Sequence, residues 1–308
     1  MNTPYLAFHL PPSVLYQGTN RYNGAPLLLI HNFAFWRKWK IQLGPSIATP
    51  GLIDPRGVVC WRHNGGDKAE LKADDRKLKG YKVRTWRLWC EHGKDYVKNV
   101  KAIRKMGQGP DPDVVETQRK DKPVTADEVV YLRWTNPFSR QTRKYHFQYA
   151  DIDFYWKGTG SIRETRACGL FLKWNHLKLV AVIRSSFKNE YTTREPDKLK
   201  ICLGKYASSA AVKKSGTLEL YDASIWRLVC EHMPPVLQQI QSISILGDTK
   251  HYYDEDNETR RMMALKRTHL YQVIVATAMC MIQGEREKRE VVKAILLELI
   301  TGGGGAAG

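Results

Sequence analysis

Residues 273–282, which read Val-Ile-Val-Ala-Thr-Ala-Met-Cys-Met-Ile, constrain the fold more than any other part of the chain. Wound as an α-helix, this segment has no polar side for nearly three turns, so other groups must shield it from water. At 1.5 Å per residue it spans about 15 Å, half of the hydrocarbon core of a bilayer. Its length therefore excludes a lipid-spanning helix, and we expect a helix enclosed by β-structure.

The chain from residue 25 to 225 has the pattern of β-strands: short apolar runs, rich in β-branched and aromatic residues, between turn residues. Nothing in this range sustains the 3.6-residue period of a helical bundle or of alternating strands and helices. After residue 233, Pro234 and Pro235 predict the start of an amphipathic helix. The predicted strands are residues 27–30, 35–43, 58–62, 81–89, 129–134, 142–149, 151–157, 170–174, 178–183, 198–203 and 217–221.

Several of these segments carry a family resemblance. Residues 144–149 (Lys-Tyr-His-Phe-Gln-Tyr) and 154–158 (Phe-Tyr-Trp-Lys-Gly) read as paired strands, 178–183 and 218–220 as later strands, and 269–289 as an apolar helix that ends in charges. Together they resemble the tubby C-terminal-like superfamily of tubby proteins, phospholipid scramblases and LURP-one-related proteins, most closely its largely uncharacterised fungal members. The resemblance implies an all-β fold, a closed antiparallel barrel of about twelve strands around a central hydrophobic helix.

The resemblance covers residues 25–290, which we take as one barrel domain. Residues 1–24 are expected to form an N-terminal extension, and residues 291–308 the helix end with a flexible Gly-rich tail. Two stretches, at about 104–128 and 233–258, are interpreted as irregular insertions. The wider segments 90–128 and 230–258 depart from the compact pattern and are either insertions or errors in the gene sequence as written.

The charge of the chain favours an anionic partner. Lysine and arginine exceed aspartate and glutamate by 18, and residues 1–150 hold 13 of that excess. Cations interleaved with Trp and Tyr attract phosphates of lipid headgroups or nucleic acid. The alternative is a solvated exterior with aromatic side chains packed beneath the charges. The candidate lipid- or anion-binding residues are Arg37, Lys38, Lys40, Lys82, Arg84, Arg87, Arg140, Arg143 and Lys144.

A near-repeat suggests a metal site that we rank low. Residues 86–92 and 226–232 match at six of seven positions. On strands, Cys90 with His92 and Cys230 with His232 would each share one face, and together they would suit tetrahedral zinc. The Cys-x-His spacing is not that of a usual zinc knuckle, so similar strand ends or chance explain the repeat better than zinc does. We assign no metal and no cofactor.

No catalytic pattern stands out. Glycine-rich phosphate loops, nucleophile elbows and zinc-protease motifs are missing from the sequence. Asp151 and Asp153 could form a carboxylate pair on one strand face, but residues solvated beside a turn explain them better. We therefore expect no enzyme and assign no catalytic residue.

These observations predict a non-enzymatic basic module that binds anionic surfaces. Because tubby proteins bind phosphoinositides, the resemblance makes phosphoinositide or anionic lipid headgroups the first expectation. The alternatives are a nucleic-acid-binding or nuclear regulatory protein, and a structural protein with no small ligand. With six scattered cysteines and no signal peptide, we expect a monomer in the cytoplasm, peripheral to a membrane or nuclear, and not an integral membrane protein.

Overall fold

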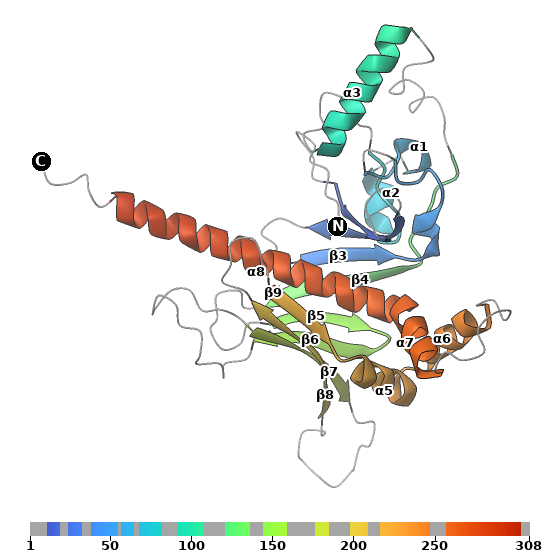
Figure 1. Cartoon of the computed structure of the whole chain (residues 1–308), viewed down its shortest axis with the longest axis vertical. Coiled ribbons are helices and arrows are strands. Elements are labelled where there is room, and N and C mark those ends of the chain that lie inside the picture. The colour runs from blue at the N-terminus through green and yellow to red at the C-terminus, as the bar shows by residue number, and fades with distance from the viewer. Residues whose placement is uncertain are drawn as a thin grey trace, which may run out of the picture. The chain divides into compact units, whose positions relative to one another are not determined.

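The structure is a computed structural model of the chain, and its strands form a nine-stranded sheet (Figure 1). Each strand pairs with its neighbours in the chain, in the order β1 to β9, and every pair with a described register is antiparallel. The chain divides into two compact units, Met1–Tyr131 and Leu132–Gly308. The described residues are 11–18, 24–32, 38–54, 57–64, 68–81, 91–107, 121–135, 144–158, 176–184, 198–208, 216–246 and 257–302.

The first unit is built on β1 (Ser13–Gln17), β2 (Ala25–Asn32) and β3 (Lys38–Leu43), and β4 (Glu128–Thr135) begins in it. Between β3 and β4 lie a 3-10 turn (Pro45–Ala48) and the helices α1 (Trp61–Asn64), α2 (Lys68–Ala73) and α3 (Glu91–Met106). One hydrophobic cluster joins the strands to this connection. Its buried members are Val14, Leu29, Ile47, Leu52, Val59, Leu78 and Ala126.

Gly44 marks a close approach within this unit. It has a φ of 133°, and a Cβ on it would overlap the Asp127 carboxylate. That carboxylate accepts hydrogen bonds from the Ser46 backbone N–H at 3.3 Å and the Ser46 hydroxyl at 3.0 Å. Glycine at position 44 thus lets the chain after β3 turn against the residue that precedes β4.

Four predictions in the first unit need correction or comment. The part assigned to an N-terminal extension contributes β1, which pairs with β2. Residues 58–62 form only isolated bridges, because α1 begins at Trp61 and the chain reverses at Gly57, whose φ is 79°. In the predicted loop 104–128, α3 extends to Met106 and β4 begins at Glu128. The predicted strand 81–89 lies outside the described residues except for Tyr81.

The second unit holds the last five strands of the sheet. They are β5 (Lys144–Tyr149), β6 (Ile152–Gly158), β7 (His176–Arg184), β8 (Lys198–Ser208) and β9 (Gly216–Leu220), which confirms five predicted strands. Ala150 and Asp151, with φ of 44° and 62°, join β5 to β6 and pair Tyr149 with Ile152. Two positive-φ residues in a two-residue hairpin loop are typical of a type I′ turn. The predicted strand 170–174 lies outside the described residues.

Helices follow β9: α5 (Asp222–His232), α6 (Pro234–Leu246), α7 (Asn257–Arg267) and α8 (His269–Gly302). The helix predicted at Pro234 is confirmed, and it fills much of the stretch that we interpreted as an irregular insertion at 233–258. The strand end predicted at 226–232 is wrong. The buried residues Ile225, Leu228 and Val229 follow the spacing of a helix. This spacing, and not the strand alternation that places Cys230 and His232 on one face, describes the segment.

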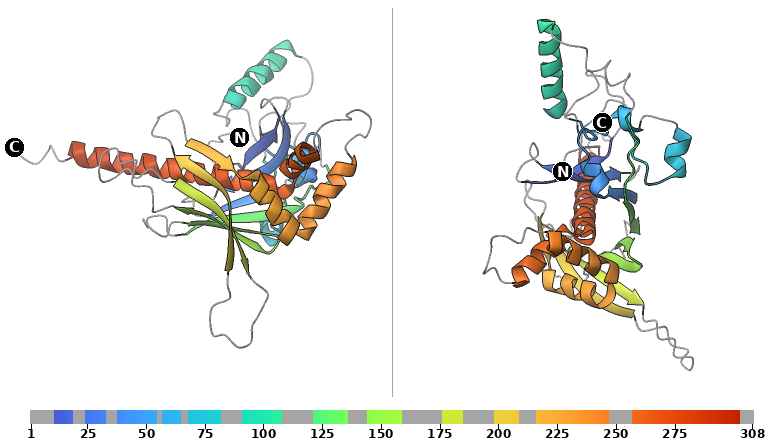
Figure 2. Two further views of the ribbon diagram at one scale, coloured as in Figure 1. Left: turned by 60° about the horizontal axis from the view of Figure 1, so that its bottom comes forward. Right: turned by 90° about the vertical axis from the view of Figure 1, so that its right-hand side faces the viewer.

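Helix α8 lies along the sheet of the second unit (Figure 2). Val273, Ile274, Ala276, Ala278 and Met281 have no exposed surface. The Trp156 indole N–H on β6 donates to Thr277 Oγ1 at 3.3 Å, and the Tyr145 hydroxyl on β5 donates to Glu285 Oε1 at 2.8 Å. The apolar segment is thus helical and buried against β-structure, as expected. The charged stretch after it does not leave the protein at once, since Glu285 is only 3% exposed.

The predicted fold class is confirmed only in part. The antiparallel sheet and its C-terminal helix are present, but the chain is not all-β, because α3 and α5–α7 add helical structure. The strand order runs from β1 to β9 without closing on itself among the described residues. A closed barrel around a central helix is therefore not part of the described structure.

Candidate anion-binding face

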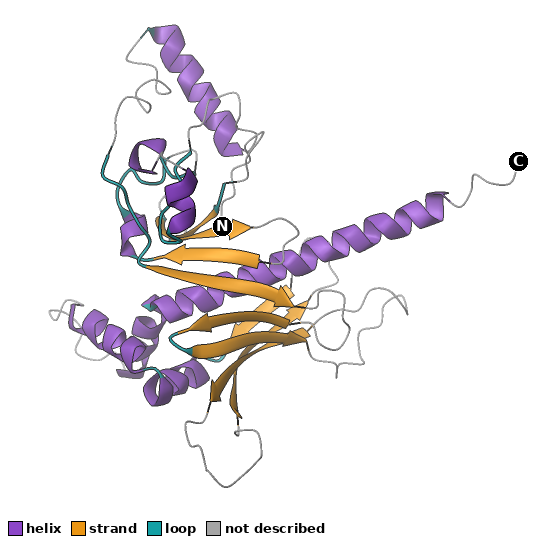
Figure 3. Ribbon diagram, turned by 180° about the vertical axis from the view of Figure 1, so that it is seen from behind, coloured by secondary structure: helices purple, strands orange, loops and turns teal. Residues whose placement is uncertain are grey.

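Strands β5 and β6 separate an inner from an outer side of the sheet. Tyr145, Phe147, Phe154 and Trp156 are fully buried, and Tyr145 and Trp156 contact α8. Residues that alternate with them point the other way, because successive side chains of a strand lie on opposite faces. In Figure 3, seen from behind, the strands of this unit lie in front of α8. We call the side facing away from α8 the outer face.

A row of lysines crosses the outer face. Lys144 on β5 pairs with Lys157 on β6, Lys157 pairs with Lys178 on β7, and Lys178 pairs with Lys205 on β8. Directly paired residues lie on the same face, with Cβ atoms about 5 Å apart, so these four lysines form one line, here called the lysine row. Like charges directly opposite each other destabilise a sheet. The lysine row therefore lowers the stability of the sheet.

Only one end of the row is neutralised within the described residues. Lys205 pairs with Glu219 on β9, and their side chains form an ion pair at 2.8 Å that raises the pKa of Lys205. Lys144, Lys157 and Lys178 form no ion pair with any described residue. The other three members of the row therefore carry positive charge that the described part of the protein does not balance.

Lys157 lies at the centre of this charge. Partial burial lowers its pKa, and the positive charges of Lys144 and Lys200 lower it further. Lys200, an exposed residue of β8, pairs with Val182 and so shares the outer face. Crowding of cations that lowers a lysine pKa means a positive local potential, which a bound anion would relieve.

Aromatic and polar groups occupy the outer face beside the row. Lys157 Nζ lies 4.8 Å from the centre of the Tyr155 ring, and the His146 ring stacks on that ring at 4.7 Å. His146 Nε2 and Asp153 Oδ1 are 2.8 Å apart. The Asp153 carboxylate therefore contacts His146, whereas Asp151 is exposed in the hairpin turn. The two aspartates do not form the carboxylate pair that we considered.

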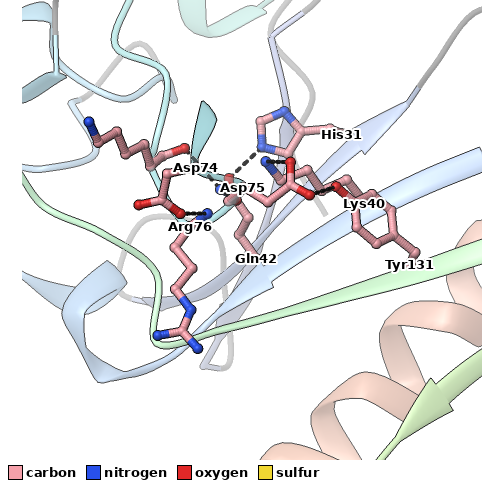
Figure 4. Close-up of polar contacts among 8 residues, drawn as sticks. His31, Lys40, Gln42, Asp74, Asp75, Arg76 and Tyr131 are labelled. Carbon is pink, nitrogen blue, oxygen red and sulfur yellow. Dashed lines mark hydrogen bonds and ion pairs between the residues drawn. The ribbon is translucent and has the colours of Figure 1, made fainter. Parts of the chain in front are cut away.

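The other lysines that we proposed and that the structure describes, Lys38 and Lys40, have internal partners. Lys40 Nζ lies 3.2 Å from Asp75 Oδ1, and Tyr131 donates a short hydrogen bond to Asp75 Oδ2 (Figure 4). Lys38 Nζ lies 3.9 Å from the centre of the Tyr131 ring. The hydrogen bond from Tyr131 is the main cause that lowers the pKa of Asp75; burial opposes this shift, and Lys40 and Lys38 lower the pKa further. This cluster ties residues 74–77 to the strands and neutralises Lys40.

Gln42 and His31 complete that cluster. The Gln42 amide NH₂ donates to the carbonyl oxygens of Asp75 at 2.8 Å and Lys77 at 3.0 Å, so its Oε1 must face His31 Nε2, which lies 2.7 Å away. His31 Nε2 therefore carries a proton and donates to Gln42. Burial lowers the pKa of His31 to about 4; the Gln42 bond opposes this shift, and Lys40 and Lys79 support it.

The remaining site predictions have mixed outcomes. Arg37, Lys82, Arg84, Arg87, Arg140, Arg143 and Cys90 lie outside the described residues. Of the near-repeat, His92 begins α3, whereas Cys230 and His232 end α5. The shared strand face is therefore wrong for Cys230 and His232, because residues two apart on a helix point to different sides. Within the described ranges, no three His, Cys, Asp or Glu residues could hold a metal ion.

Of the lysine row, the sequence had identified only Lys144. A signal for its neighbour was present: a two-residue loop at 150–151 would pair Lys144 with Lys157 by counting along the hairpin. Lys178, Lys200 and Lys205 carried no such signal, because their register depends on connections longer than a tight turn.

Comparison of the chain with protein-family models, curated proteins and solved structures finds no match. Within the part of the chain that the structure describes, no helix is both long and apolar enough to cross a membrane.

Proposed function

We propose that the outer face of the second unit is a non-enzymatic docking surface for anionic membranes, with phosphoinositide headgroups as its preferred ligand. The observation that carries this proposal is the lysine row, in which Lys144, Lys157 and Lys178 oppose one another with no described carboxylate between them. A phosphate lying over the row would replace like-charge repulsion by charge-assisted hydrogen bonds. The protein would then act at the cytoplasmic face of a membrane.

The magnitude fits reversible docking. Each lysine near an anionic membrane contributes about 1 kcal/mol, so the three unbalanced lysines supply about 3 kcal/mol, or roughly a hundredfold in affinity. Exposed charges act over a Debye length of about 8 Å at physiological ionic strength, which makes such docking sensitive to salt. Tyr155, beneath Lys157, adds a rigid amphipathic side chain at the same place.

We also propose that the chain is a tubby-like protein with α8 as the central helix of a barrel. The burial of α8 on the sheet and its bonds to β5 and β6 support this assignment. A rigid sheet backed by a buried helix would hold the lysines in fixed register, so that the membrane meets a preformed row.

The test is vesicle flotation with the full chain at low salt. Phosphatidylcholine vesicles carry either phosphoinositide or phosphatidylserine at matched charge, and the protein variant is Lys144→Gln/Lys157→Gln/Lys178→Gln. We expect the wild type to prefer phosphoinositide vesicles and the triple variant to lose roughly a hundredfold in affinity.

Lys205→Gln provides the matched control for this test. Lys205 belongs to the same row but already has Glu219 as its partner, so its loss should change binding by less than about threefold. Equal absence of binding to all vesicles would refute the proposal and leave a structural role. If Lys205→Gln lost as much binding free energy per lysine as the triple variant does, net charge and not the row would drive binding.

A further inference from the structure

Helix α3 in the first unit carries a second ordered set of lysines. Lys94, Lys98, Lys101 and Lys105 follow one another at intervals of four, three and four residues, and all four are exposed. This spacing places them along one side of a helix, with neighbouring Cβ atoms about 5–6 Å apart. At 1.5 Å per residue the lysine stripe is about 16 Å long.

The other side of α3 anchors it to the protein. Val100 is 2% exposed and Val97 is half-buried, and neither belongs to the stripe. The four lysines therefore lie on the exposed side of the helix, away from Val100. A helix that lies in a membrane surface needs its apolar side for the lipid. In α3 the protein already covers Val100, which leaves the exposed lysines to act through their charge.

The stripe lacks balancing charges among the described residues, where none of its four lysines forms an ion pair. Like charges three or four residues apart destabilise a helix. The helix dipole compensates for Lys101 and Lys105 near the C-terminal end, but it disfavours Lys94 in the second turn. By sequence, Glu91 and Asp95 subtract two charges and Arg104 adds one, which leaves α3 with a net charge of +3.

We infer that the lysine stripe of α3 binds the phosphate backbone of nucleic acid without reading its sequence. Each strand of duplex DNA carries one negative charge per about 3.4 Å of axis, so the stripe runs along about five phosphates of one strand, enough to give each lysine a partner. An anionic membrane offers no such linear array. This inference is independent of the docking proposed for the second unit, since it uses a different surface and a different partner.

The experiment measures binding of the full chain to short random-sequence duplex DNA, and to single-stranded RNA of the same length, over a range of salt concentrations. Neutralising Z phosphates gives a slope of log affinity against log salt of about −0.9Z for duplex DNA. Four lysines therefore contribute about −3.6 to this slope. The variant Lys94→Gln/Lys98→Gln/Lys101→Gln/Lys105→Gln should lose that contribution and bind DNA at least about tenfold more weakly at low salt.

Two controls make the result decisive. Glutamine has nearly the helix propensity of lysine, and circular dichroism shows whether helix content is kept. If the quadruple variant fails to fold, the single variants Lys98→Gln and Lys101→Gln are used, each expected to reduce the steepness of the slope by about 0.9. The variant Lys144→Gln/Lys157→Gln/Lys178→Gln, altered only in the second unit, should keep the wild-type slope.

The inference is overturned if the wild type does not retard nucleic acid at low salt. It is equally overturned if the α3 variants bind with the wild-type slope, or if the loss appears in the second-unit variant instead.

Discussion

Lysines on the strands of the two units have different neighbours. On β3, Lys40 points to Asp75, which also accepts a hydrogen bond from Tyr131, and Lys38 covers the Tyr131 ring. On β5 to β7, Lys144, Lys157 and Lys178 oppose one another. Lysine side chains therefore stabilise the cluster around Asp75 in the first unit, whereas they repel one another on the sheet of the second unit. The comparison teaches that the position of nearby carboxylates, more than the number of lysines, decides whether a basic strand is structural or available to a ligand.

The largest effect is expected in the structural cluster. Gln42 is fully buried, and Gln42→Leu would remove its hydrogen bonds to the carbonyls of Asp75 and Lys77 and to the His31 N–H. Since each lost hydrogen bond costs about 1 kcal/mol, we expect a loss of about 3 kcal/mol in the free energy of unfolding, measured with urea. Gln148→Leu, on the exposed side of β5, is the control and should change it by less than about 0.5 kcal/mol.

The pH dependence of the same cluster comes next. His31 has a folded-state pKa of about 4, below its ordinary value of 6.5. Between pH 6.5 and pH 4, His31 is protonated in the unfolded chain but remains neutral in the folded protein. The contribution of His31 to the free energy of unfolding is therefore complete above pH 6.5. It decreases as the pH falls towards 4, by up to about 1.4 kcal/mol per pH unit.

Unfolding free energies of the wild type and of His31→Asn, measured across this range, check this prediction. The variant should lack the part of the pH dependence that belongs to His31. Parallel curves for the two proteins would contradict the neutral, buried state that we assign to this histidine.

Single lysine substitutions should act in opposite directions in the two regions. Lys40→Met removes the ion pair with Asp75 and should lower the free energy of unfolding by about 1 kcal/mol. Lys157→Gln removes two like-charge oppositions and should raise it by about 0.5 kcal/mol. Denaturant unfolding at low salt measures both effects. If both variants are destabilised, the contrast between the two regions does not hold.

An effect of similar size concerns the hairpin that sets the register of the row. Asp151 has a φ of 62°, which glycine adopts without steric cost. Asp151→Gly should therefore change stability by no more than about 0.5–1 kcal/mol and in the stabilising direction, whereas Asp151→Ala should be destabilising. Thermal unfolding of both variants tests the turn. A stabilising alanine would mean that the left-handed conformation is wrong.

Much of the fold could be predicted from residue patterns. The apolar segment 273–282 required a buried helix, and short aromatic runs between turn residues identified β5 and β6. The helix α5 was missed because its short apolar run fits a strand as well as a helix until its length is known. Strand β1 was missed because Ser13–Gln17 is short and lies next to Pro11 and Pro12.

The candidate site was harder to predict for a physical reason. Charge composition indicated an anionic partner and favoured the first half of the chain, yet Lys38 and Lys40 there have internal partners. The lysine row depends on register between strands that lie far apart in the sequence, and composition contains no information on register. The stripe on α3 was visible in principle at its helical spacing, but the stretch was interpreted as irregular from residue 104 onwards.

The most direct test of the central claim is the thermal stability of wild type and Lys157→Gln with and without a soluble inositol polyphosphate. If the lysine row is an anion site, the ligand should raise the melting temperature of the wild type, and Lys157→Gln should start higher and gain much less. Equal gains in the two proteins, or no gain in the wild type, would contradict the account.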